Sequence, residues 1–277
     1  MAQVTLSNSV RFSLLSLQSN AAQLSRSQER LSSGLAVDSG LDNPTNFFTA
    51  QDLNSRAGDL AALADGVTSA VQTIAAADKG ITGIARLVES AQATARQALE
   101  APATLAGGGA NPRRAELVAT YNIILEQIGA VARDASYKGV SLLTGDNLAV
   151  PFNEDGSSKL TIEGVDDSPT GLGLVTLVST AFDSDATIRA TLGDLEAALG
   201  TLRIQSSRLG ANLSVAETRQ VFMANMADVL VKGAANLTLA NADSEGANVL
   251  ALQTRQQLSS TALSLAAQAD QNVLRLF

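Results

Sequence analysis

The sequence contains neither cysteine nor histidine. Without cysteine there is no disulfide, no thiolate nucleophile and no zinc-thiolate site, and without histidine the commonest general base and metal ligand are missing. Serine-histidine and cysteine-histidine catalysis are both excluded. We therefore expect no enzyme activity, no metal site and no cofactor.

Aromatic residues are also scarce, at 3% of 277 residues with no tryptophan, although 45% of the residues are hydrophobic. Much of that apolar content is alanine, which favours thin contacts between helices over a thick globular core. The net charge of −8 argues against nucleic acid and anionic membrane as partners, because both need a basic surface. We expect the chain to bind neither.

No apolar run approaches the roughly 20 residues that cross a bilayer, so the sequence does not predict a membrane-spanning protein. The first residues lack the cationic start, apolar centre and small-residue cleavage site of a secretory signal. If the protein leaves the cell, we expect it to use another route.

The first predicted helix carries a heptad seam, in which residues recur at alternating spacings of four and three. The seam consists of Val10, Leu14, Leu17, Ala21, Leu24, Gln28, Leu31 and Leu35. A helix cannot bury its own stripe, so another helix must cover it. From Met1 to Gln28 only Arg11 and Arg26 are charged, which favours protein contact on the polar face as well. The alternative is an uncharged, loosely ordered N-terminal tail.

Turn-forming residues at 36–45 separate this helix from a longer one that ends before Pro102. Asn111 and Pro112 are suited to begin a third helix, which we expect Gly139 to end. The seam of the second helix is Leu53, Leu60, Val67, Val71, Ile74, Ile81, Ala85, Val88, Ala95 and Leu99. The seam of the third is Leu117, Tyr121, Ile124, Ile128, Val131 and Ala135.

A β-hairpin is predicted next, because apolar residues occupy alternate positions on both sides of a turn at 154–156. These residues are Leu148, Val150, Phe152, Leu160 and Ile162. A long helix then begins near Ser184 and would extend roughly 70 Å, a length typical of a coiled coil. Its seam is Ile188, Leu192, Leu195, Leu199, Leu202, Ser206, Leu209, Leu213, Ala216, Gln220, Met223, Ala227, Leu230 and Ala234.

A joint over 233–246 leads to the last helix, which carries Leu250, Leu258, Ala262, Leu265, Ala269, Val273 and Leu276. The two chain ends share a scarcity of charge, so we expect the first and last helices to lie side by side. The predicted fold is mainly α, a long antiparallel helical bundle or coiled coil with a small β-hairpin region at the middle of the chain. The predicted parts are paired terminal helices (1–40 and 240–277), a long-helix middle domain (41–145 and 180–239) and the hairpin region (146–179).

Four segments resemble motifs of bacterial flagellin, the subunit of the flagellar filament. They are Glu29 to Leu35, Tyr137 to Leu143, Asn241 to Asp243, and Ala267 to Leu274. The resemblance covers about 1–145 and 185–277. Two departures are the segment from Asp42 to Phe48, where the family is usually rich in Ala and Gly, and Ser244, where it usually has Phe.

The resemblance implies a subunit that polymerises with copies of itself into the extracellular flagellar filament for swimming motility, with the paired terminal helices as its filament-core domain. It also implies export unfolded through the flagellar channel. The implied partners are the flagellar export machinery, an export chaperone, and the cap and hook-associated proteins. The outer domains of many relatives are nearly absent, since only about 40 residues separate the helical halves. A hook-filament junction protein of the same axial family and a non-flagellar coiled-coil adaptor are the alternatives.

Contacts between subunits are expected from the terminal seams, at Val10, Leu14, Leu17, Leu24, Leu31, Leu35, Leu250, Leu258, Leu265, Val273 and Leu276. The inner seams at 53–99 and 188–234 are expected to cover one another within one chain. Arg86 and Glu89 match part of the segment that innate immune receptors recognise in some flagellins, with Val88 at a position that is usually Arg.

Two features are compatible with an enzyme, and each has a simpler interpretation. Gly107 to Gly109 has no Gly-Lys-Ser/Thr after it and no strand before it, so it is expected to be a flexible connection and not a phosphate loop. The carboxylates Asp38, Asp42, Asp166 and Asp167 have no spacing that requires a metal, and we expect them to be solvated loop residues.

Overall fold

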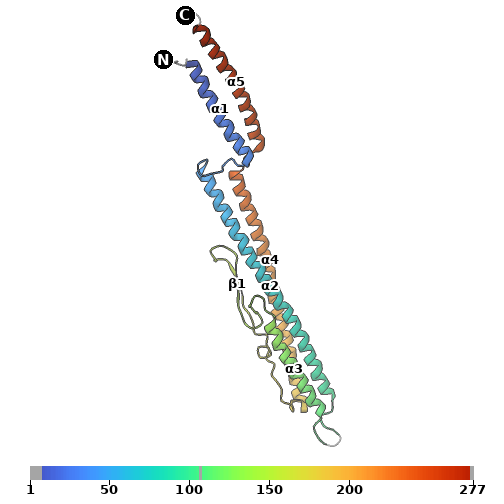
Figure 1. Cartoon of the computed structure of the whole chain (residues 1–277). Coiled ribbons are helices and arrows are strands. Elements are labelled where there is room, and N and C mark those ends of the chain that lie inside the picture. Colours follow the sequence, from blue (N-terminus) through green and yellow to red (C-terminus); the bar gives the residue numbers. More distant parts are fainter. Residues whose placement is uncertain (1–7, 106–107, 275–277) are drawn as a thin grey trace. The chain divides into compact units, whose positions relative to one another are not determined.

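The computed structural model describes residues 8–105 and 108–274 (Figure 1). Its helices are α1 (Asn8–Ser33), α2 (Pro44–Glu100), α3 (Pro112–Asp134), α4 (Asp185–Thr238) and α5 (Ala242–Leu274). Two strands, β1 (Leu148–Pro151) and β2 (Lys159–Ile162), and a short 3-10 helix, η1 (Ala181–Asp183), lie between α3 and α4. The predicted mainly α fold is confirmed.

The chain divides into two compact units, which we call the terminal unit (Met1–Ser55 with Val229–Phe277) and the middle unit (Arg56–Asp228). The division falls within α2 and within α4. The hairpin belongs to the middle unit by its contacts. The three-part division predicted above, with boundaries at 40 and 240, stays a prediction.

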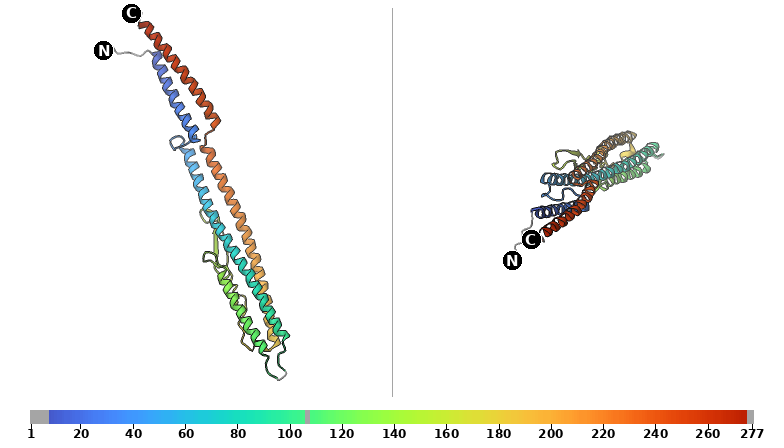
Figure 2. Two further views of the ribbon diagram at one scale, coloured as in Figure 1. Left: turned by 45° about the vertical axis from the view of Figure 1, so that its right-hand side comes forward. Right: turned by 90° about the horizontal axis from the view of Figure 1, so that it is seen from above.

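The core of the middle unit consists of α2, α3 and α4, which lie side by side in Figures 1 and 2. Every predicted seam residue of these helices is buried or half-buried, as expected for stripes that cover one another. Ser206 donates a hydrogen bond to Asp78 at 2.9 Å, and Gln220 donates one to Thr68 at 2.7 Å, so α4 is also tied to α2 by polar contacts. The predicted intramolecular bundle is confirmed.

Gly80 permits the close approach of α2 to the chain after α3. A Cβ at this position would lie 2.5 Å from the Cβ of Ala135 and from a methyl carbon of Leu143. Real Cβ atoms do not approach other atoms so closely, so any larger residue would push α2 away from the end of α3.

Helix α3 begins as predicted and ends earlier than predicted. The Asn111 side chain accepts a hydrogen bond from the Arg113 amide at 3.1 Å, with Pro112 at the first turn. The helix ends at Asp134, whereas Gly139 was expected to end it. The reason is a tight turn beyond the helix, in which Lys138 and Gly139 both take a positive φ.

Arg114, only 1% exposed, connects the start of α3 to the segment before α4. Its guanidinium donates to the Ala101 carbonyl at 2.6 and 3.0 Å and to the Phe182 carbonyl at 2.7 Å. It also forms an ion pair with Asp185 at 2.8 Å. Arg114 therefore donates hydrogen bonds to carbonyls in both the loop before α3 and the segment before α4.

The predicted hairpin is confirmed, with β1 and β2 antiparallel and Val150 opposite Leu160. Val150 and Ile162 are buried in the middle unit. Beyond the strands, Glu154 accepts a hydrogen bond from Arg56 at 3.1 Å, and the guanidinium of Arg219 lies 5.2 Å from the centre of the Phe152 ring. These contacts hold the hairpin against α2 and α4.

The joint between α4 and α5 is shorter than the predicted 233–246, because α4 continues to Thr238 and α5 begins at Ala242. The segment after α1 pairs with this joint. The amides of Ala36 and Val37 donate to the Thr238 carbonyl at 2.7 and 3.2 Å, and the Ala240 amide donates to the Gly34 carbonyl at 2.9 Å.

Part of α2 is long and apolar enough to cross a membrane by composition alone, with a mean hydropathy of 1.3 over 18 residues. One-third of that stretch is buried, and apolar side chains of α2 that lie in the core of the middle unit include Val67, Ile74 and Ile84.

Candidate functional site: the paired terminal helices

Helices α1 and α5 lie side by side in the terminal unit, as predicted (Figures 1 and 2). Asn20 on α1 donates a hydrogen bond to Ser259 on α5 at 3.3 Å. Nearer the joint, Arg30 forms an ion pair with Glu245 at 3.5 Å. Segments from the two ends of the chain are therefore brought together, and their contacts include polar groups.

The face that α1 turns toward α5 repeats every three and four residues. Its buried and half-buried members include Val10, Ser13, Leu17, Asn20, Leu24 and Ser27. The corresponding residues of α5 are Val249, Leu252, Gln256, Ser259, Leu263 and Ala266. About half of this seam is polar or small, so it buries little apolar surface for its length.

The observed seam differs from the predicted one at some positions of α1. Val10, Leu17, Ala21 and Leu24 of the predicted seam are buried or half-buried, whereas Leu14, Gln28 and Leu31 are exposed. Ser13, Asn20 and Ser27, which were not predicted, are buried or half-buried. A seam needs two residues per heptad, and either neighbour of the shared positions satisfies that spacing. Periodicity therefore did not decide which of the two faces meets α5.

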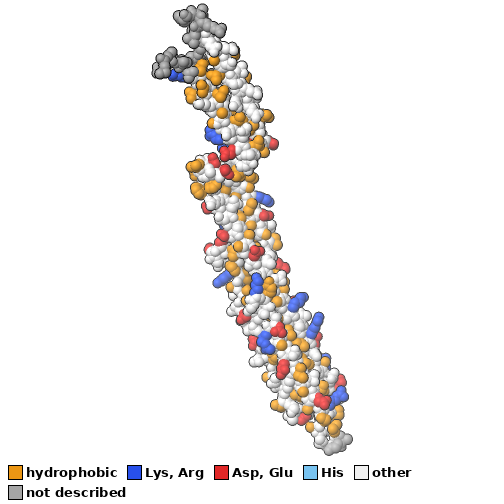
Figure 3. Space-filling model, in the orientation of Figure 1, with side chains coloured by type: hydrophobic (Ala, Val, Ile, Leu, Met, Phe, Trp, Pro, Cys, Tyr) orange, Lys and Arg blue, Asp and Glu red, His pale blue; other side chains and the backbone are white. Residues whose placement is uncertain are grey.

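The largest apolar side chains of the two helices lie outside their common seam. Leu258 and Leu265 are 65% and 62% exposed, and on α1 Phe12 is 76% exposed. Leu258 and Leu265 are one heptad apart, so they lie on one face of α5. Figure 3 shows hydrophobic side chains on the visible surface of α1 and α5.

The predicted contact residues divide into three groups. Val10, Leu17 and Leu24 lie in the seam, and Leu35 is half-buried beside Leu239. The exposed group is Leu14, Leu31, Leu250, Leu258 and Leu265. The side chain of Val273 and the whole of Leu276 lie outside the described residues.

The sequence patterns did not identify Phe12 and Leu15, which are exposed on α1. They also did not identify Leu252 and Leu263, which lie on the face of α5 that meets α1. A signal was present, because a helix with leucines at 250, 252, 258, 263 and 265 is apolar on more than one side. Such a helix needs more than one apolar partner. Among the described residues, the helix that α5 contacts most is α1.

Three arginines, Arg26, Arg30 and Arg255, line a hollow of about 310 Å³ between α1 and α5. Behind them, a hydrogen bond from the Ser27 hydroxyl lowers the pKa of Glu245, with smaller contributions from Asn248 and Arg30 against the opposing effect of burial. Glu245 is therefore ionised at neutral pH. One of its oxygens, Oε2, has no hydrogen-bond partner in the part of the chain that the structure describes.

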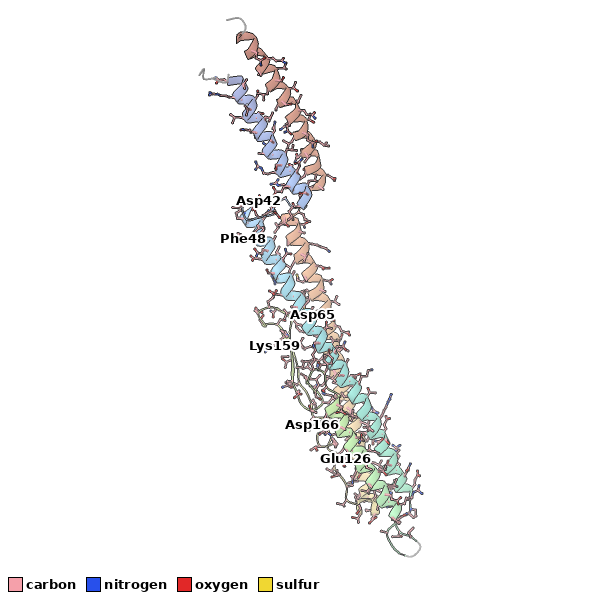
Figure 4. All side chains as sticks on the ribbon, in the orientation of Figure 1. Asp42, Phe48, Asp65, Glu126, Lys159 and Asp166 are labelled. Atoms are coloured by element: carbon pink, nitrogen blue, oxygen red, sulfur yellow. The ribbon has the colours of Figure 1, made fainter. Side chains whose placement is uncertain are left out.

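Asp42, labelled in Figure 4, holds the loop after α1. Its carboxylate accepts hydrogen bonds from the hydroxyl and the amide of Ser39, both at 3.0 Å, and these bonds lower its pKa. Asp42 is exposed, as predicted. Across residues 8–105 and 108–274 no acidic cluster has the geometry of a metal site.

Arg86 and Glu89 are exposed on α2 in the middle unit. They border a shallow groove whose other side includes Leu199, Leu202 and Arg203 of α4. Their positions on the surface are established, and recognition by an immune receptor stays a prediction.

Asp166 and Asp167 were both expected to be solvated, and that expectation is wrong for Asp167. Asp166 is exposed and accepts a hydrogen bond from the Ser168 amide at 3.0 Å (Figure 4). Asp167 is fully buried, and neither carboxylate oxygen has a hydrogen-bond partner among the described residues. Burial raises the pKa of Asp167 to about 6, with Asp166 adding to the rise and Arg208 opposing it.

We expect Asp167→Asn to reduce the pH dependence of unfolding. Because the pKa of Asp167 is about 6 in the folded chain and 3.8 ordinarily, the proton stabilises the fold at low pH, and this stability is lost as pH rises through 6. Between pH 5 and pH 8 the wild-type loss is about 1 to 1.5 kcal/mol, because the folded-state carboxyl titrates about one pH unit above pH 5. Urea unfolding at pH 5 and pH 8 measures it.

Glu126 is exposed on α3 (Figure 4), so Glu126→Gln is the control for removing a carboxylate. It should keep the wild-type difference between pH 5 and pH 8. If Asp167→Asn also keeps that difference, the buried carboxyl does not titrate as described.

Residues 7–148 match the family described as the bacterial flagellin N-terminal helical region. The chain is 29% identical to flagellin FljM of Caulobacter vibrioides over 95% of this chain and 94% of that protein. It is 26% identical to a flagellin of Brucella melitensis over 100% and 99% of the two chains. The crystal structure of Bacillus cereus flagellin aligns with 56% of this chain and 85% of its own, at 15% identity and a TM-score of 0.45.

Proposed function

Because this chain belongs to the bacterial flagellin family, it is a structural subunit of the flagellar filament, and we propose that α1 and α5 supply its main contacts with neighbouring copies. The family is structural and not catalytic. The observation that carries the proposal is the exposure of Leu258, Leu265 and Phe12 on two helices that cover one another through a partly polar seam.

The free energy of such contacts comes from the burial of apolar surface between copies. At about 25 cal/mol per Å², burying an extra 1,000 Å² of apolar surface per subunit contributes on the order of 25 kcal/mol. The cost of ordering the helices is of similar size, so the balance depends on how much apolar surface meets neighbouring copies. A monomer in solution obtains none of this burial, and its exposed leucines favour self-association.

We expect the terminal helices to be disordered in the dilute monomer and to become ordered on assembly. Their seam contains Ser13, Asn20 and Ser259 where a stable coiled coil carries large apolar residues. Hydrogen exchange of α1 and α5 should be fast in the monomer and at least 100-fold slower in filaments. The α2–α4 core of the middle unit should be protected in both states, and slow exchange of both terminal helices in the monomer would contradict the proposal.

The proposal extends to export and to the ends of the filament. A chain whose terminal helices have little core of their own loses little when it is threaded unfolded through the flagellar channel. The proposed partners are the flagellar export machinery, an export chaperone, and the cap and hook-associated proteins, and the proposed location is the extracellular filament. Cells without a working flagellar export apparatus should retain the protein inside.

The alternative of a hook-filament junction protein predicts a different amount of protein. A filament subunit is present in many copies along the whole length of sheared filaments, whereas a junction protein is confined to one end. Quantifying the chain in sheared filaments separates the two.

A further inference from the structure

The hollow between α1 and α5 concentrates positive charge in an acidic protein. The terminal unit has 6 basic and 7 acidic residues, and the middle unit has 13 basic and 20 acidic residues, so the middle unit carries a net charge of −7. Three of the six basic residues in the terminal unit line this one hollow.

Two of the three guanidinium groups are not ion-paired. Arg30 pairs with Glu245, but neither Arg26 nor Arg255 has a carboxylate within 4.0 Å among the residues that the structure places. Both side chains are exposed at the rim of the hollow. Two free guanidinium groups offer paired N–H donors that match the two oxygens of a carboxylate.

The hollow is continuous with the leucine face of α5. Ala251 lines the hollow and lies one heptad before Leu258, which in turn lies one heptad before Leu265. A copy that covers these leucines therefore also covers the rim of the hollow. Removing Arg26 and Arg255 from water without a counter-charge is costly, so the covering surface must supply negative charge.

We propose that the hollow lined by Arg26, Arg30 and Arg255 binds a carboxylate side chain of a neighbouring copy of this chain in the filament. The proposal rests on the proposed contact between copies through α5. A second copy is the fitting occupant because it brings the acidic middle unit and the same leucine face. The ionic contact sets the register of the copies, while the leucines supply the apolar burial.

The test measures polymerisation of the purified wild-type protein and of the double variant Arg26→Gln/Arg255→Gln. Both proteins are measured at 50 and 500 mM NaCl. The double variant should raise the critical concentration for assembly about tenfold at low salt, because one charge-assisted contact per subunit is lost. It should also lose most of the salt dependence that the wild-type protein shows. Helical content by circular dichroism should be unchanged, since both side chains are exposed.

Two controls isolate the position and the charge. Arg11→Gln removes an exposed arginine from α1 outside the hollow and should assemble like the wild-type protein. Arg255→Lys keeps the charge and should keep the salt dependence. The proposal is overturned if the double variant assembles with the wild-type critical concentration and salt dependence. It is also overturned if inorganic phosphate binds the monomer through these arginines without changing assembly.

Failure of this inference is distinguishable from failure of the proposed function. If Leu265→Asp blocks assembly while the arginine variants behave like Arg11→Gln, only the ionic contact is wrong. If Leu265→Asp assembles normally, the contact through α5 on which the inference rests is wrong as well.

Discussion

Replacing Leu265 with aspartate is expected to abolish filament assembly while leaving the monomer folded. Leu265 is 62% exposed and faces away from α1, so the monomer has no apolar contact to lose there. In a filament contact, the substitution removes a buried leucine and places a carboxylate in its position, which costs well over about 3 kcal/mol per subunit. The critical concentration should therefore rise more than about 100-fold.

Sedimentation and electron microscopy measure assembly of this variant, and circular dichroism with hydrogen exchange of the middle unit measures its fold. Leu265→Met keeps the apolar contact and should assemble. Val178→Asp places a carboxylate at a similarly exposed apolar side chain that belongs to the middle unit, and it should also assemble. Normal filaments from Leu265→Asp would remove this face of α5 from the filament core.

Truncating Arg114 to alanine is expected to lower the free energy of unfolding of the middle unit by about 3 kcal/mol. The substitution leaves the carbonyls of Ala101 and Phe182 without the donor that now satisfies them. Asp185 contributes less, because its side chain is 47% exposed and water replaces the lost partner. Urea unfolding followed by circular dichroism measures the change.

The neighbouring Arg113 is the matched control, since its side chain is exposed on the same turn of α3. Arg113→Ala should change stability by less than about 0.5 kcal/mol. Arg114→Lys should recover only part of the loss, because an ammonium group cannot reproduce the planar fork of donors that reaches several carbonyls. Equal stability of Arg114→Ala and Arg113→Ala would show that the buried guanidinium contributes nothing.

The two units bury apolar surface differently, so Leu265→Asp is expected to change assembly and Arg114→Ala to change stability. In the middle unit, the seams of α2, α3 and α4 cover one another, and a single core includes the hairpin. In the terminal unit, α1 and α5 pack against each other, and each keeps large apolar residues in water. We therefore expect the middle unit to be stable by itself, and the proposed function has the terminal helices depend on neighbouring copies.

The sequence by itself determined the helical fold, the hairpin and the existence of the terminal pairing. In α2, α3 and α4 every predicted seam residue is buried or half-buried, because long stripes with one apolar face have one way to be covered. The hairpin followed from alternation on both sides of a turn, whereas its register, with Val150 opposite Leu160, came from the structure. The identity of the family followed from ordered motifs at both ends.

Only the tertiary structure decided which face of α1 meets α5, where α3 ends and that Asp167 is buried. Periodicity shows which side chains share a face, but a helix that is apolar on two sides has two acceptable faces, and packing chooses between them. Burial of Asp167 depends on where the segment after β2 folds back, which no local pattern records. These features arise from contacts between residues far apart in the chain, so they enter only when the helices are assembled.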